Sequence, residues 1–143
     1  MKVFSPDDYS LKHEFKVGFS RVDIAIQSCG RIVVVGYNGE LVILDPKTGV
    51  KLHHHQSSKY GSTVGLAVDS DDRIYVTQHL HKQLIVFDPD LNLIGPINGL
   101  PDLTMAWGLK AVGGGNKITL YVAEQGRVST FPIEFKPNLK KDM

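Results

Sequence analysis

A unit of about 43 residues recurs along this chain of 143 residues, and it constrains the fold more than any other feature of the sequence. Three separate anchors return in the same order: an apolar segment, a segment that begins with a cation and isoleucine, and a proline turn. The anchors are Asp23–Ile26, Gly65–Val68 and Gly108–Ala111; Arg31–Val35, Arg73–Thr77 and Lys117–Tyr121; and Phe4–Pro6, Leu44–Pro46 and Phe87–Pro89, with a degenerate Phe131-Pro132 in the last unit. A strand is predicted over 128–135 in that unit. The four prolines are separated by 40, 43 and 43 residues, which favours a stack of similar structural units.

Each complete unit has the pattern of four short strands. The predicted strands are Val22–Ile26, Ile32–Val35, Glu40–Leu44 and Val50–His54 in one unit, and Gly65–Asp69, Ile74–Gln78, Gln83–Asp88 and Leu93–Ile97 in the next. Residues typical of tight turns, such as Asn38-Gly39 and Asp45–Gly49, lie between them. No stretch of ten or more residues has a helical period, so the sequence predicts an all-β protein.

Four short antiparallel strands per unit of this length describe one blade of a β-propeller. A β-sandwich is the alternative, because its strands and turns look similar over short stretches. A sandwich does not require the same four-strand pattern with the same turn residues to recur, so the repeat favours propeller blades.

The segments Gly65–Thr77 and Gln83–Asp90 carry a recognisable resemblance. They read G-L-A-V-D-S-D-D-R-I-Y-V-T and Q-L-I-V-F-D-P-D, and this pattern resembles an NHL repeat. The match is good over 62–98, weaker over 19–54 and weakest over 105–135. The resemblance implies a propeller blade with a binding surface, and it implies no particular reaction.

The composition fits an intracellular globular protein. The 16 Lys and Arg balance 15 Asp and Glu, which argues against nonspecific phosphate binding as the main activity. Cys29 is the single cysteine, so no internal disulfide is expected. No apolar run has the length of a spanning helix and the N-terminus lacks a signal pattern, so we expect a cytoplasmic protein without a membrane partner.

The strands add up to about three blades, which is half of the six-bladed ring that the NHL resemblance implies. We expect one domain, in which 1–18 form the outer strands of a shared blade, 19–61 and 62–104 each form a blade, and 105–143 form an incomplete blade. An open half-ring exposes two apolar faces, so a homodimer is predicted, with Leu11–Val17 of one chain completing the third blade of the other. The alternative is a truncated product whose other blades are lost or lie elsewhere.

One rim of the blades is predicted to bind a ligand, because it gathers the turns between second and third strands and the links between blades. The predicted residues of this face are Tyr37, Tyr60, His79, His81, Lys82, Trp107, Gln125 and Arg127.

A metal site on this face is the sharper alternative. Its possible ligands are His54, His79 and His81, since neutral imidazole suits zinc, and the NHL-like group includes a zinc lyase with histidines on such loops. Period-two alternation sends His53 and His54 to opposite faces, and metal binding needs convergent ligands, so solvated loop histidines are the preferred interpretation. No catalytic residue and no cofactor are predicted.

The sequence therefore predicts a non-enzymatic binding or scaffold module that recognises a protein or peptide. Single-stranded RNA is an alternative ligand, because some NHL domains bind it and cations are scattered near the proposed face. Those cations are Lys12, Lys16, Arg21, Lys59, Lys82, Lys110 and Arg127. A degenerate metal-dependent propeller lyase or lactonase is the enzymatic alternative.

Overall fold

The computed structural model describes residues 1–8, 11–19, 23–56, 63–78, 83–97, 108–124 and 126–135, and these form only strands and turns. The strands make four antiparallel sheets that follow one another along the chain. The sheets are β1 (Lys2–Phe4) and β2 (Leu11–Glu14); β3 (Asp23–Ile26), β4 (Ile32–Val35), β5 (Glu40–Leu44) and β6 (Lys51–Gln56); β7 (Thr63–Val68), β8 (Ile74–Gln78), β9 (Gln83–Phe87) and β10 (Leu93–Ile97); and β11 (Gly108–Gly114), β12 (Lys117–Glu124) and β13 (Arg127–Glu134).

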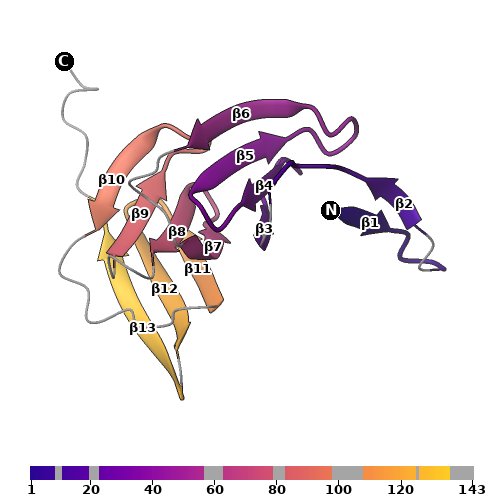
Figure 1. The fold of residues 1–143 in the computed structure, drawn as a ribbon. Coiled ribbons are helices and arrows are strands. Elements are labelled where there is room, and N and C mark those ends of the chain that lie inside the picture. Colours follow the sequence, from indigo (N-terminus) through magenta and orange to yellow (C-terminus); the bar gives the residue numbers. More distant parts are fainter. Residues whose placement is uncertain are drawn as a thin grey trace.

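The sheets are arranged as propeller blades. Within each of the three larger sheets, strands pair in chain order, and the first strands β3, β7 and β11 lie beside one another. Figure 1 shows the result as an arc, with β1 and β2 at one end and β11–β13 at the other. We call β3–β6, β7–β10 and β11–β13 the first, second and third blades, and β1–β2 the N-terminal hairpin. The predicted all-β fold with propeller blades is confirmed.

Branched side chains between the blades form the core. Along the second strand of each blade, alternate residues face opposite neighbours: Val33 and Val35 pack against the second blade, whereas Ile32 and Val34 pack the other way. The second blade turns Ile74 and Val76 to the first blade and Tyr75 to the third; the third turns Ile118, Leu120 and Val122 back to the second. The first and second blades are therefore apolar on both faces, and each of these faces is buried by the structural unit beside it.

The N-terminal segment covers the outward face of the first blade. Met1, Phe15 and Phe19 pack against the cluster that contains Val17 and Ile32. Gly49, in the turn after β5, has a φ of +72° and leaves room for the Phe15 ring where a Cβ would clash.

The N-terminal hairpin has the construction of the outer half of a blade. In β1–β2, β5–β6 and β9–β10 the pair nearest the turn is followed at once by a register shift. Those three pairs are Phe4 with Leu11, Leu44 with Lys51, and Phe87 with Leu93. Phe4, Leu44 and Phe87 therefore occupy equivalent positions, each followed by a turn that contains a proline.

One predicted anchor of the repeat is wrong. The spacing aligns Pro132 with Pro46 and Pro89, but Pro132 lies inside β13, as the strand predicted over 128–135 requires. Ile133 pairs with Ile118 as Phe87 pairs with Ile74, so the structural equivalent of Pro89 is Phe135. The third blade pairs its second and third strands in the same register as the second blade, but it lacks a proline at the position of Pro89. The regular spacing of Pro132 from Pro89 is therefore a coincidence.

Replacing Leu120 with alanine tests the packing between the second and third blades. Leu120 is fully buried, so we expect Leu120→Ala to lower the free energy of unfolding by about 2–5 kcal/mol in chemical denaturation. Val50→Ala is the control, because Val50 is exposed and should change stability by no more than about 0.5 kcal/mol. Equal losses for the two variants would contradict this account of the core.

Candidate interaction surfaces

The structure places two residues of the predicted binding face. Tyr37 lies half-buried in the turn between β4 and β5, and exposed Arg127 begins β13 after the turn from β12. These turns are equivalent in the first and third blades, so both residues belong to the predicted rim. The other predicted residues, Tyr60, His79, His81, Lys82, Trp107 and Gln125, lie outside the described residues.

The histidines of β6 join two blades. His53 and His55 are half-buried on the side of the second blade, whereas His54 is exposed, as the predicted alternation requires. The His55 ring meets the Phe87 ring edge-on, with centroids 4.9 Å apart, and His53 Nε2 lies 3.5 Å from Asp90 Oδ1. Two of the three histidines therefore help to hold the outer strand of the first blade to its neighbour.

Of the proposed metal ligands, only His54 is within the described part of the chain, where no three His, Cys, Asp or Glu side chains gather closely enough to hold an ion. The metal site on His54, His79 and His81 stays an untested prediction.

At the rim opposite the predicted binding face, turn side chains clamp the first blade to the second. Arg31 donates a hydrogen bond from Nη2 to the Pro89 carbonyl at 2.8 Å and forms an ion pair with Asp90 at 3.1 Å. Ser28 donates from its backbone N–H and its hydroxyl to the Asp72 carboxylate, both at 2.7 Å. The buried Gln27 amide donates to the carbonyls of Asp72 and Pro89. Charge-assisted and backbone bonds of this kind fix the angle between blades.

A second clamp of the same design joins the second blade to the third. Ser70 donates from its N–H and its hydroxyl to the Gly113 carbonyl, at 3.0 and 2.8 Å. Arg73 donates from Nη2 to the Gly115 carbonyl at 2.7 Å and lies over the Phe135 ring, 4.0 Å from its centroid. The Asp71 carboxylate also accepts a hydrogen bond from the Gly115 N–H.

The buried Asp69 carboxylate holds Arg73 in place. Asp69 accepts hydrogen bonds at 2.7 Å from Arg73 Nε and from the Tyr75 hydroxyl. Burial, together with this hydrogen bond to Asp69, raises the pKa of Tyr75 well above its ordinary value, so the phenol remains a donor at any physiological pH. Asp69 is buried and hydrogen-bonded, so it holds the Arg73 side chain in the position from which Arg73 bonds the third blade.

The clamps were missed by the sequence analysis, although a signal for them exists. Ser28 and Arg31 recur as Ser70 and Arg73, each pair three residues apart in the first hairpin of its blade. In the third blade Lys117 occupies the position of Arg31 and Arg73, immediately before an isoleucine.

Two acidic turn residues are already occupied by their own turns. Asp88 accepts hydrogen bonds from the N–H groups of Asp90 and Asn92, and Asp45 accepts them from Lys47 and Thr48. Partial burial acts to raise the pKa of Asp88, but the bonds from Asn92 and Asp90 outweigh it and lower the pKa. The bonds from Lys47 and Thr48 lower the pKa of Asp45. Both carboxylates therefore serve as turn caps rather than as a ligand site.

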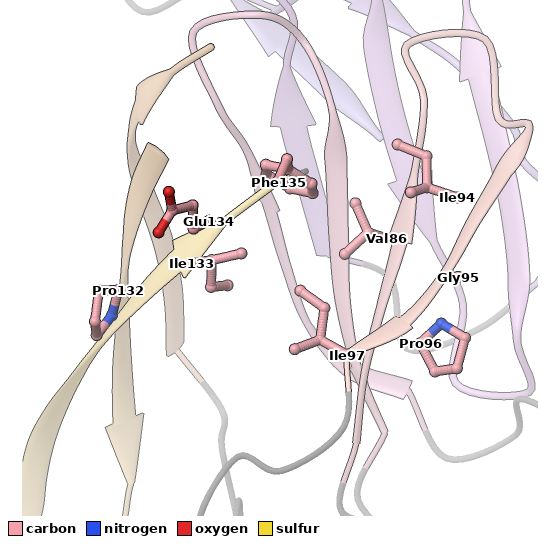
Figure 2. A pocket seen from close by; sticks show the side chains of 9 residues that line it. All are labelled: Val86, Ile94, Gly95, Pro96, Ile97, Pro132, Ile133, Glu134 and Phe135. Carbon is pink, nitrogen blue, oxygen red and sulfur yellow. The ribbon is translucent and has the colours of Figure 1, made fainter. Parts of the chain in front are cut away.

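An apolar groove of about 320 Å³ separates the outer strands of the second blade from β13. Figure 2 shows Ile133 and Phe135 directed toward Val86 and Ile97 across the groove, while Glu134 points away on the other side of β13. In the first and second blades a fourth strand lies beside the third; β13 has no such partner among the described strands.

Two more hollows lie at the ends of the arc. One, of about 380 Å³, lies on the outward face of the third blade and is lined by Val112, Lys117, Thr119 and Pro132 among others. The other, of about 730 Å³, lies beside the N-terminal segment and the turn that contains Asn38. These three hollows thus lie beside the blades or at the ends of the blade array.

Comparison with known proteins supports the fold. No protein-family profile matches the chain, and no curated protein matches it. Among solved structures, that of U3-55K, a WD40 β-propeller protein, superimposes with a TM-score of 0.67 at 15% sequence identity. The match covers 91% of this chain and 44% of that structure, so the chain spans less than half of a similar propeller protein.

This comparison shows propeller-like blades, and membership of the NHL family stays a prediction. Within the described residues, no helix is long and apolar enough to cross a membrane.

The contact of His55 with the second blade predicts a pH-dependent stability. Burial, and secondarily the neighbouring charge of His54, hold the pKa of His55 below its ordinary value of 6.5. The unfolded chain therefore binds a proton at a pH where the folded chain does not, and stability falls as the pH drops below about 6.5. We expect a smaller loss in His55→Gln than in the natural chain when unfolding free energies are compared at about pH 7.5 and about pH 5.5. His54→Gln should reduce the slope less than His55→Gln does, because the charge of His54 is the smaller of the two causes. The same slope in all three proteins would refute the assignment.

Proposed function

We propose that this protein is a non-catalytic binding module that recognises a protein or peptide at the rim formed by the second turns of its blades. A propeller-like fold is in general a protein-interaction scaffold. The proposed recognition residues among those described are Tyr37 and Arg127, in equivalent turns of the first and third blades.

The observation that carries this proposal is the pair of clamps at the opposite rim. Hydrogen bonds from Arg31 and Arg73 fix each blade to the next, so the turns of the recognition rim are held at a set spacing. Binding by a rigid scaffold costs less conformational entropy than binding by separate loops. An aromatic ring with a hydroxyl and a guanidinium suit a peptide that carries an acidic residue.

Single-stranded RNA would use the same two residues, by stacking on Tyr37 and phosphate contact with Arg127. The near balance of charge, with a net value of +1, favours a peptide, because basic surfaces that bind RNA are usually denser. A lyase or lactonase has no support from a metal-binding cluster among the described residues.

Peptides selected from a random library on the intact protein provide the test. We expect their affinity, measured by fluorescence anisotropy, to fall at least about fivefold in Tyr37→Ala and in Arg127→Gln, since each variant removes one rim contact. Lys47→Gln is the matched control for charge, because exposed Lys47 lies at the opposite rim in the turn after β5. Affinities that are unchanged in both rim variants would refute the proposed face. If no peptide is selected and an oligouridine probe binds with an affinity that falls as salt rises, the ligand of this rim is RNA and not a peptide.

A further inference from the structure

The two ends of the blade array expose residues whose repeat equivalents are buried. Leu44 and Phe87, which end the third strands of the first and second blades, are each 1% exposed, because a preceding structural unit covers them. Phe4 occupies the same position in the N-terminal hairpin and is 53% exposed. The hairpin therefore presents the face that a blade normally turns toward its predecessor.

The third blade is uncovered on the complementary face. By the register of β12, Thr119 and Tyr121 correspond to Val33 and Val35, which the second blade buries against Phe87. Tyr121 is 41% exposed, whereas Val35 is 2% exposed. The hollow of about 380 Å³ beside Val112 and Thr119 lies on this face.

Polar groups at the two ends also correspond to an existing contact. Inside the chain, Arg31 of the first blade reaches the Pro89 carbonyl and Asp90 in the third turn of the second blade. Lys117 occupies the position of Arg31, lines the open hollow and is exposed. Pro6 and Asp7 occupy the positions of Pro89 and Asp90, and both are exposed. One end thus carries the donor of a clamp and the other end carries its acceptors.

We propose that a second copy of this chain docks its N-terminal hairpin on the outward face of the third blade. In this contact Phe4 fills the hollow beside Val112 and Thr119 and packs near exposed Tyr121 on the same face. Lys117 bonds the Pro6 carbonyl and Asp7. The interface repeats, between copies, the one that joins the first and second blades. Because each copy has both ends, the contact made twice closes a two-fold ring.

The proposed contact packs the exposed face of the N-terminal hairpin on the outward face of the third blade. It does not extend the third blade by a strand beside β13. The Phe135 N–H bonds the Asn116 carbonyl, and the antiparallel register then turns the nitrogen of Pro132 toward the open edge of β13. Proline has no N–H for a ladder at that edge. Phe15 and Val17, expected to complete the third blade of a partner, instead pack on the first blade of their own chain.

Sedimentation velocity on the intact chain, from low micromolar to near-millimolar concentration, tests the proposal. We expect a monomer–dimer equilibrium whose dissociation constant rises at least about tenfold in Phe4→Ala and in Tyr121→Ala. Val50→Ala, which removes a side chain of similar exposure away from both ends, should leave it unchanged. Circular dichroism confirms that each variant is folded.

Charge reversal provides the second measurement. Asp7→Lys and Lys117→Asp should each weaken the dimer, and the double variant should restore most of the affinity, because the pair is then re-formed with its charges exchanged. A chain that stays monomeric at every concentration would overturn the proposal. A dimer whose dissociation constant is unchanged by Phe4→Ala, Tyr121→Ala and both charge reversals would also overturn it. Open oligomers that grow with concentration would overturn the closed two-fold ring.

Discussion

Burial of a two-faced sheet by its neighbours is the constraint on which this structure depends. The first and second blades are thin sheets with apolar residues on both sides, and no helix or second layer covers them among the described residues. Val33 and Val35 are buried only because the second blade lies against them, and Tyr75 only because the third does. Stability is therefore a property of the contacts between blades, as in other repeat proteins.

Packing of this kind sets the distance between blades. The clamps at one rim add directional contacts, since Arg31 and Arg73 each bond a backbone carbonyl of the following blade. These bonds have a fixed direction, and they turn a stack of sheets into a rigid support for the turns at the other rim. The buried carboxylate of Asp69, which accepts bonds from both Arg73 and Tyr75, connects the clamp to the core.

The sequence predicted the strands and the order of the blades well, because period-two patterns and turn residues such as Asn38-Gly39 are local signals. It failed where a single residue served as an anchor: Pro132 lies inside β13, and only the pairing of Ile133 with Ile118 reveals the correct register. The clamps were not predicted, since Arg31 and its acceptors on Pro89 and Asp90 are far apart in sequence. Much of the predicted recognition face, including His79 and Trp107, lies outside the described residues.

The faces that point toward the C-terminal end are more polar in the second and third blades than in the first. The equivalent positions hold Val33 and Val35 in the first blade, Tyr75 and Thr77 in the second, and Thr119 and Tyr121 in the third. A threonine–tyrosine face tolerates water better than two valines, which lowers the free-energy cost of leaving the outward face of the third blade exposed. The hydroxyl groups of Thr119 and Tyr121 can also form hydrogen bonds with a partner that packs on this face. Such a surface suits reversible association, in which the stability of the array increases with protein concentration because a second copy binds only the folded state.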